Sequence, residues 1–247
     1  MMLTVLFFGV LLTGLITELL KNKLEKFSHF LISFSVSIVL ALICVHILPE
    51  LFSNENPTIG YYVLAGFVIQ ILLELLSKGI EHGHVHFHGK ISTKQLFIIF
   101  IGLSIHSFIE GIPINTIEEA HHAHHHHHVM EYQFSWIYLS MILIHKLPIA
   151  AVLIIFLNSM DVKNLKKYTL LLIFACTSPF GALFGEQLIY FSFFNDWAMK
   201  FLALSTGMLL HITTLLIFED HHQSNKKIKN ILTISLGILV GLLLFSF

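Results

Sequence analysis

The stretch His106-Ser107-Phe108-Ile109-Glu110-Gly111 lies inside an apolar segment, residues 95–116, that has the length of a membrane-spanning helix. His106 and Glu110 are four residues apart, so a helix presents both side chains on one face, about one turn apart. Ionisable groups at membrane depth are costly and are typical of a substrate or ion path. An imidazole and a carboxylate together suit zinc and related divalent cations. This stretch therefore predicts a membrane protein that binds metal within the bilayer.

A second polar group, His145-Lys146-Leu147-Pro148, lies in another apolar stretch. With His106 and Glu110 on one span and His145 on the next, three candidate ligands can converge inside a helix bundle. Two histidines and a carboxylate form a ligand set found in zinc sites. The two stretches together predict a single intramembrane metal site built from two helices.

Proline residues accompany the polar groups in three apolar stretches. Pro113 follows the first group, Pro148 ends the second, and Thr177-Ser178-Pro179-Phe180-Gly181 lies in a third stretch. Proline removes a helix hydrogen bond, and membrane proteins tolerate this where neighbouring groups or a lined cavity satisfy the freed carbonyls. We therefore expect interrupted helices at these prolines, arranged around a path through the bundle.

The composition indicates an integral membrane protein made of helices. The chain has 247 residues, of which 55% are hydrophobic and 12% charged, and its mean hydropathy is +0.80. Soluble domains carry about 25% charged residues. We expect an all-α fold, a bundle of eight transmembrane helices forming a single domain over residues 1–247, with the first span retained and not cleaved as a signal peptide. The predicted spans are 2–20, 29–52, 59–77, 95–116, 134–157, 168–192, 198–218 and 229–247.

The lysines predict the orientation of the bundle. Three lysines follow each of the first, third, fifth and seventh spans, which accounts for twelve of the fourteen, and the chain has no arginine. Positively charged loops face the cytoplasm, so both termini are predicted to lie outside, and an even number of spans is consistent with two termini on the same side. The net charge of −1 argues against a nucleic-acid partner. A compact, arginine-free chain favours a prokaryotic inner membrane.

Two connections between spans are rich in histidine. The first, about residues 78–94, lies on the predicted cytoplasmic side, and the second, about residues 117–133, on the outer side. Neutral imidazoles bind zinc or nickel even without ordered structure, so both loops are candidates for loose metal capture. The alternative is a solvated loop of low complexity with no defined site. The candidate residues are His82, His84, His86 and His88 in the first loop and His121, His122, His124, His125, His126, His127 and His128 in the second.

Four short motifs match the pattern of one family of membrane proteins. A fourth-span pattern H-[S/N]-x-x-E-G appears as His106, Ser107, Glu110 and Gly111, and a fifth-span H-K as His145-Lys146. The second span ends in His46-Ile47-Leu48-Pro49-Glu50, which is similar to H-L-L-P-E. The segment from Gly207 and Leu210 to Glu219-Asp220 is similar to a glycine-to-acidic stretch of the seventh span. In this combination, and in its eight predicted spans, the chain resembles the ZIP (Zrt/Irt-like) divalent-metal transporters over nearly its whole length.

The resemblance implies a transport site near the middle of the membrane, with His106, Glu110 and His145 as its primary metal ligands. Some members hold a second, adjacent metal with Asn or Asp and further Glu residues. This chain departs from that pattern, because Ile149 and the poorer ligands Ser107 and Ser178 stand at the corresponding positions. Lys146 adds a positive charge that would repel a second cation. We therefore expect one transport metal at this site.

Other polar residues are candidates for the metal path or for its support: Ser107, Lys146, Ser178, His46, Glu50, His211, Glu186, Glu219 and Asp220. His46 and Glu50 lie toward the outer end of the second span. There they either attract incoming cations or anchor the helix at the interface.

Three alternatives concern the later spans. His211 is either an inner ligand of the path or a partner in an interhelical hydrogen bond. Glu186, deep in the sixth span, supports either a ligand or a packing contact. Glu219 and Asp220 lie at the predicted cytoplasmic exit, where they either receive released metal or carry ordinary interfacial charge.

These features predict an importer that moves divalent metal toward the cytoplasm, with Zn²⁺ preferred and Fe²⁺, Mn²⁺, Cd²⁺ and Co²⁺ as substrates of similar chemistry. Transport makes no covalent bond, so we expect neither an enzyme nor a cofactor. The expected partners are the metal ion and the lipid bilayer, with a homodimer as an option because Gly237 and Gly241 form a G-x-x-x-G pair.

The alternatives are a metal-binding sensor without transport, a membrane-embedded metallohydrolase and an exporter of the cation-diffusion class. The hydrolase would need a base beside its metal, as H-E-x-x-H supplies, and the chain lacks that motif. Exporters of that class usually have six spans and a cytoplasmic C-terminal domain, whereas this chain ends at Phe247 within its last predicted span.

Deleting residues 121–128 should weaken uptake at scarce zinc and leave the maximal rate largely intact, because the predicted role of this outer loop is to raise the local metal concentration. Free imidazoles have a pKa of about 6.5, and protons compete with metal, so the advantage should fade in mildly acidic medium. Uptake curves at two pH values, with and without the loop, measure both effects. A collapse of the maximal rate at saturating zinc would instead make the loop part of the transport machinery.

Overall fold

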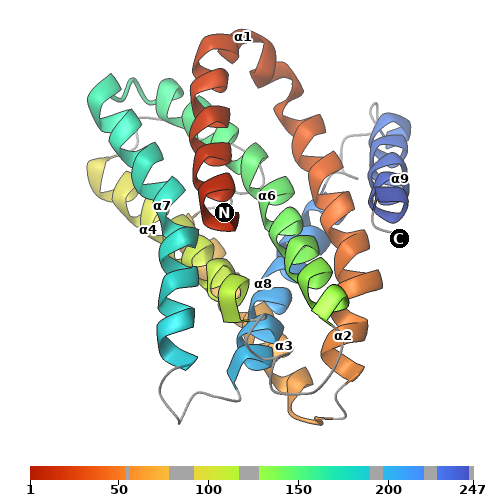
Figure 1. Ribbon diagram of the computed structural model, residues 1–247. Coiled ribbons are helices and arrows are strands. Elements are labelled where there is room, and N and C mark those ends of the chain that lie inside the picture. The colour runs from red at the N-terminus through yellow and green to blue at the C-terminus, as the bar shows by residue number, and fades with distance from the viewer. Residues whose placement is uncertain (54–55, 78–91, 117–127, 190–196, 220–226, 245–247) are drawn as a thin grey trace.

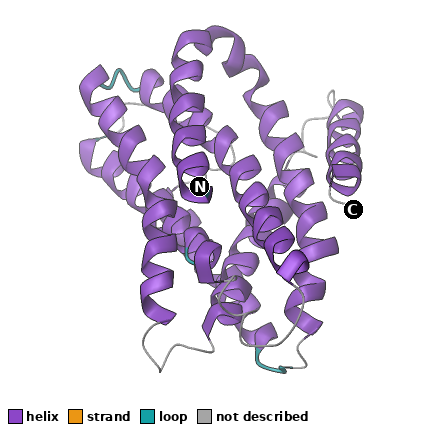
Figure 2. Cartoon of the chain, viewed as in Figure 1, coloured by secondary structure: helices purple, strands orange, loops and turns teal. Residues whose placement is uncertain are grey.

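A computed structural model of the chain describes residues 1–53, 56–77, 92–116, 128–189, 197–219 and 227–244. These residues are helical throughout apart from short turns, and they include no strand (Figure 2). The predicted all-α fold is therefore confirmed for the described part of the chain. Its elements are α1 (Met2–Leu42), η1 (Ile43–Ile47), α2 (Leu48–Ser53), α3 (Ile59–Ser77), α4 (Thr93–Gly111), α6 (His128–Ser159), α7 (Asn164–Ile189), α8 (Ala198–Glu219) and α9 (Lys227–Leu244).

Seven segments of the described chain are long and apolar enough to cross a membrane, judged by length and composition. They are Met2–Leu20, Phe27–Ser53, Ile59–Leu76, Thr93–Thr116, Phe134–Ser159, Asn164–Leu188 and Ala198–Leu215. Each overlaps one of the first seven predicted spans. The eighth prediction corresponds to a shorter apolar helix, Ile228–Leu244.

The first candidate span and most of the second belong to one helical element, α1, that folds back on itself. The backbone of α1 stays helical over 41 residues, and Figure 1 shows two arms that meet in a bend where the label α1 stands. The first arm packs on α6 and α7, since Gly9 faces Leu143 and Gly14 faces Leu171. The second arm continues through η1 into α2. The loop expected between these two spans is therefore a helical bend.

The prolines disturb their helices less than the sequence predicts. Pro148 lies inside α6 and Pro179 inside α7, and both helices continue through them, so the interruptions predicted there are wrong. A neighbouring helix can accommodate the freed carbonyl without a break. Pro113 does follow a turn, at Ile112, where α4 ends. Pro49 follows the π-helical turn η1, which adds one residue to the helical repeat.

Glycines allow close contacts between helices. At Gly66 on α3, a Cβ would collide with the carbonyl of Leu204 on α8, and at Gly207 on α8 it would collide with the carbonyl of Val63 on α3. The same relation holds between α4 and α7, where Gly111 lies against the carbonyl of Ser178. Apolar surface gains little by leaving lipid for another helix, so small residues that bring backbones together are the usual means of packing in membranes.

The G-x-x-x-G pair of α9 packs within the chain. A Cβ at Gly237 would lie 2.7 Å from the carbonyl oxygen of Phe34, and one at Gly241 would lie 3.0 Å from Cβ of Ala41. Phe34 and Ala41 both belong to the second arm of α1. This small-residue face is therefore covered by α1 and does not supply a surface for a second copy of the chain.

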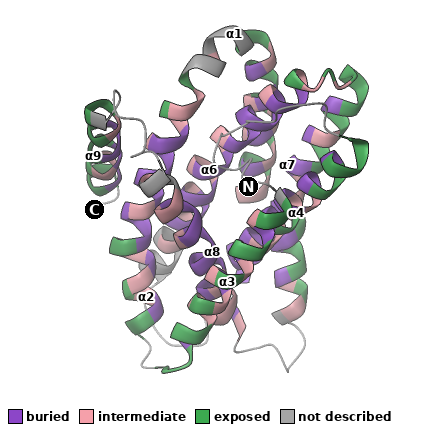
Figure 3. Ribbon diagram, turned by 180° about the vertical axis from the view of Figure 1, so that it is seen from behind, coloured by how far each residue is buried: buried purple, intermediate pink, exposed green. Residues whose placement is uncertain are grey.

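The core consists of two clusters of buried apolar residues. One cluster includes Ile114 and Ile142, and the other includes Leu103 and Ile149. On α6, His145 lies between the two clusters along the helix, at the boundary between them. Figure 3 shows exposed residues on the outward faces of the helices, α3 among them, and buried residues facing the inside of the bundle. Outward apolar side chains of this kind suit a lipid environment.

A buried polar network joins three helices at the end of the bundle where α1 bends and α6 turns into α7 (Figure 1). Nζ of Lys167, a residue that is 2% exposed, lies 2.8 Å from Oε1 of Glu18 and donates a hydrogen bond to Asn158. Asn158 donates in turn to the second oxygen of Glu18. Since each group is paired, the network ties α1, α6 and α7 together without leaving a buried charge uncompensated.

Gly207→Ala should lower the stability of the protein in detergent by about 2 kcal/mol or more, because a methyl group there must push α3 away from α8. The matched control is Gly60→Ala on α3, where the nearest atom to a new Cβ is Cε1 of Phe52 at 4.0 Å. That control should be neutral or slightly stabilising, since alanine is the better helix former. Thermal unfolding of the two variants measures the difference. Equal melting temperatures would show that this helix contact is not tight.

Candidate metal site

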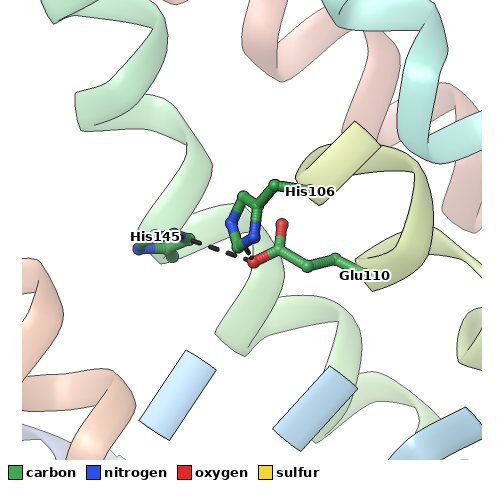
Figure 4. A group of neighbouring side chains, drawn as sticks. All are labelled: His106, Glu110 and His145. Atoms are coloured by element: carbon green, nitrogen blue, oxygen red, sulfur yellow. Dashed lines mark ion pairs between the residues drawn. The ribbon is translucent and has the colours of Figure 1, made fainter. Parts of the chain in front are cut away.

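Three buried side chains converge between α4 and α6 (Figure 4). Nε2 of His106 lies 2.8 Å from Oε1 of Glu110, and Nε2 of His145 lies 3.7 Å from the same oxygen. The side chains of His106 and Glu110 are 1% exposed and that of His145 is 2% exposed. The ligand atoms that the three residues offer all lie within 4.8 Å of one another. Among the described residues, no other group of three or more His, Cys, Asp or Glu side chains meets this condition.

The local structure of the two helices explains the convergence. His106 and Glu110 stand one turn apart on α4 and face the same way, as the four-residue spacing predicts. The ring of His145 on α6 meets that of His106 nearly edge to face, with centroids 5.9 Å apart and an interplanar angle of 82°. Two imidazole rings and one carboxylate therefore surround a common point inside the protein.

A glutamine and a tyrosine support this group from its flanks. Gln70 on α3 places Oε1 2.8 Å from Nδ1 of His106 and is fully buried. Tyr138 on α6 donates its hydroxyl to the backbone carbonyl of Glu110 at 3.0 Å. Because a phenol has one proton, the contact of 2.7 Å between Tyr138 and Ser205 must use the serine hydroxyl as donor. The positions of His106 and Glu110 are thus set by hydrogen bonds from α3 and α6.

Lys146 lies next to this group and is held by hydroxyl groups. Its Nζ donates to Oγ of Ser107 on α4 and to Oγ of Ser178 on α7. The same nitrogen lies 5.1 Å from the centre of the Phe174 ring. Ser178 donates in turn to the backbone carbonyl of Ser107 at 2.6 Å, and Ser107 also contacts Thr177. Ser107, Lys146 and Ser178 therefore form one polar cluster, with an ammonium at its centre.

The structure shows direct partners for two further candidates. Nε2 of His211 on α8 lies 2.7 Å from Oε2 of Glu74 on α3, so this histidine takes part in an interhelical hydrogen bond. Glu186 on α7 accepts a hydrogen bond of 2.9 Å from Asn115, just beyond the turn that ends α4. Both contacts join neighbouring helices away from the His106–Glu110–His145 group.

The remaining candidates are not gathered at this group. His46 lies in η1 and Glu50 in α2, both partly buried, and neither belongs to the converging set. Glu219 ends α8, but its side chain lies outside the described residues, as does Asp220. The same holds for the histidine-rich loops: His82 to His88 and His121 to His127 fall in undescribed segments, and the side chain of His128 is likewise not described. Metal capture by these loops stays a prediction.

Gln70 and Tyr138 are supporting residues that were not among the candidates predicted from sequence. Gln70 is the only amide side chain in its predicted span, and a polar residue in an apolar stretch is a signal that could have been used. Its partner could not be read from the sequence, because 36 residues separate Gln70 from His106. Tyr138 gives no such signal, since tyrosine is common in membrane helices.

The donor set suits a divalent cation. Imidazole nitrogen and carboxylate oxygen are ligands that zinc accepts, and a buried carboxylate gains most from a positive charge beside it. A bundle of membrane-spanning helices around such a group is typical of integral membrane proteins that carry metal ions.

Comparison with known families supports this class. The family model for the ZIP zinc transporters matches residues 81–247, a segment that includes α4, α6, α7, α8 and α9 and with them His106, Glu110 and His145. The chain belongs to the ZIP family, whose members transport divalent metal ions. No individual curated protein matches the chain.

Proposed function

We propose that this protein imports divalent metal, with zinc preferred, toward the cytoplasm, and that the metal binds His106, Glu110 and His145 on its way. The observation that carries the proposal is the convergence of these three ligands in a place that is almost wholly buried. Membership of the ZIP family supports transport as the activity and argues against an enzyme. The metal is the substrate and is released unchanged.

The spacing of the ligand atoms supports zinc as a substrate. In a tetrahedral zinc site with bonds of about 2.0–2.2 Å, neighbouring ligand atoms lie roughly 3.3–3.6 Å apart. The two separations from Oε1 of Glu110, 2.8 Å to His106 and 3.7 Å to His145, lie on either side of this range. Small side-chain movements would therefore suffice for binding. Three protein ligands leave a fourth position for water, and an incomplete shell favours exchange over permanent retention.

The proposed topology has eight crossings with both termini outside. The last helix, α9, has 18 residues and a length of about 27 Å, close to the hydrocarbon thickness of about 30 Å. The bend of α1 and the turn between α6 and α7 lie at the same end of the bundle (Figure 1), and both segments carry lysines. Positive charge gathered at one end supports that end as the cytoplasmic side.

The proposed route is consistent with the remaining polar residues. On this topology, His46 and Glu50 lie toward the outer end of the bundle and His211 toward the inner end, and Glu219 and Asp220 follow in the sequence at the proposed cytoplasmic exit. They would attract metal at one face and receive it at the other, while His106, Glu110 and His145 replace its water shell in between. Access to the two faces in turn requires one group of helices to move against another. The protein would lie in the inner membrane of a prokaryote.

Lys146 supports a central site for one metal. Its ammonium lies between Ser107 and Ser178, the side chains that would otherwise face a second ion beside Glu110. Two like charges a few ångströms apart in a buried place repel strongly. The lysine would therefore occupy the electrostatic place of a second metal.

His106→Ala or Glu110→Ala should remove most zinc uptake into proteoliposomes, by about tenfold or more, while the protein remains folded. Each variant takes away one of three ligands, so the metal leaves water without adequate replacement of its shell. The matched control is Ile105→Ala, next to His106 on the outward face of α4 and 40% exposed, which should transport normally. Normal uptake by both site variants at limiting zinc would disprove the site assignment. Metal binding without flux in the unmodified protein would favour a sensor.

Lys146→Asp should raise the number of zinc ions bound at the centre from one to two, because it removes a positive charge and adds an oxygen ligand. The measurement is metal content per protein in chains whose loop histidines are replaced. Lys163→Asp, at an exposed position after α6, makes the same change of charge away from the centre and should leave the number at one. Two central metals in the unmodified core would contradict the account of Lys146.

A further inference from the structure

Gln70 on α3 contacts a proposed metal ligand directly, through a hydrogen bond of 2.8 Å between its Oε1 and Nδ1 of His106. Helix α3 carries none of the three ligands. Gln70 has no exposed surface, so water does not compete for its amide. The contact is therefore a dry hydrogen bond between α3 and the ring that faces Glu110.

The chemistry of this hydrogen bond specifies which nitrogen of His106 is available to a metal. An amide oxygen can only accept, so the proton lies on Nδ1 of the imidazole. Nε2, which lies 2.8 Å from Oε1 of Glu110, is then the nitrogen left to bind a metal; without metal, a contact this short needs a proton between the two atoms. Histidine ligands of metals commonly donate their other N–H to such an acceptor, which holds both the tautomer and the orientation of the ring.

The packing of α3 keeps Gln70 in this position. Gly66, Gln70 and Glu74 follow one another at four-residue intervals and share one face of the helix. Gly66 lies against the backbone of α8 at Leu204, and Glu74 pairs with His211 on α8 at 2.7 Å. Contacts one turn before and one turn after Gln70 thus fix the rotation of α3, and the amide has little freedom to leave His106.

We propose that Gln70 is a positioning residue that sets the tautomer and orientation of His106 and thereby the affinity for the transported metal. The proposal deepens the proposed function and rests on it. A neutral amide holds the ring without adding a second negative charge beside Glu110. An imidazole paired with a carboxylate binds metal more tightly, so the amide favours a site that also releases its ion.

The test compares Gln70→Met, Gln70→Glu and the control Leu73→Met in the full chain, reconstituted in proteoliposomes with zinc as the probe. Methionine has a similar volume to glutamine but no strong acceptor, and Leu73 is a buried residue of the same helix. Gln70→Met should raise the KM for zinc by about 10–100-fold with a maximal rate within about threefold of the unmodified protein. Gln70→Glu, which restores an acceptor, should show a KM at or below the original. Leu73→Met should leave both constants unchanged.

A second measurement reports on the ring without any metal. Nuclear magnetic resonance of chains with isotope-labelled histidine, with the His106 signal identified by its loss in His106→Asn, distinguishes the two tautomers. Nδ1 should be protonated in the unmodified protein and in Gln70→Glu, whereas in Gln70→Met a fraction of the rings should carry their proton on Nε2 alone, beside Glu110.

An unchanged tautomer in Gln70→Met, or an unchanged KM, would overturn the proposal. Equal losses of maximal rate in Gln70→Met and Gln70→Glu would also overturn it, because they indicate a packing role alone. The failure of the proposed function would look different: uptake would then survive His106→Ala, whatever the tautomer of the ring in the metal-free protein.

Discussion

The burial of one carboxylate, that of Glu110, is the constraint on which the arrangement of this protein depends. An isolated carboxylate is costly to place in a dry interior, and the cost falls only when hydrogen bonds and opposite charges surround it. Here the two imidazole rings lie on one side, and the ammonium of Lys146 lies on the adjacent part of α6, held by serines. Tyr138 holds the backbone at the same residue. A divalent cation would complete this compensation, which is why the same group of side chains serves both the stability of the bundle and the proposed passage of metal.

Glycines allow this polar centre to be built from several helices at once. Gly111 directly follows Glu110 and lets α4 lie against α7 at Ser178, the residue that binds Lys146. Gly66 and Gly207 bring α3 to α8 in the same way, and Gln70 stands one turn beyond Gly66. Because lipid offers no hydrophobic drive for helix association, close backbone contact and buried hydrogen bonds must hold the helices. Polar chemistry and tight packing therefore occur at the same levels of the bundle.

The sequence alone singled out His106, Glu110 and His145, because charged and imidazole side chains are too costly at membrane depth to occur there without a partner, and the structure brings these three side chains together. The four-residue spacing of His106 and Glu110 specified a shared helix face, and the structure shows that face. The proline effects at Pro148 and Pro179 were predicted wrongly, since a proline indicates a lost hydrogen bond but not how neighbouring helices compensate for it. The pairing of Gln70 with His106, of Glu74 with His211 and of Gly237 with Phe34 depends on which helices are neighbours. A single sequence does not contain that information.

The position of α9 also has a consequence for how the protein is made. The second arm of α1 leaves the ribosome well before its small-residue partner face, at Gly237 and Gly241, because α9 lies far behind it in the chain. During translation this arm must enter the bilayer before its final neighbour exists, and the buried serines Ser33 and Ser37 on it would then face lipid or the insertion machinery. The hydroxyl of Ser37 donates to the carbonyl of Ser33, and that of the buried Ser35 donates to the carbonyl of Ile32, both within α1. The hydroxyls of Ser35 and Ser37 are therefore satisfied within α1 before α9 has been made, and α9 covers this face once it has been inserted.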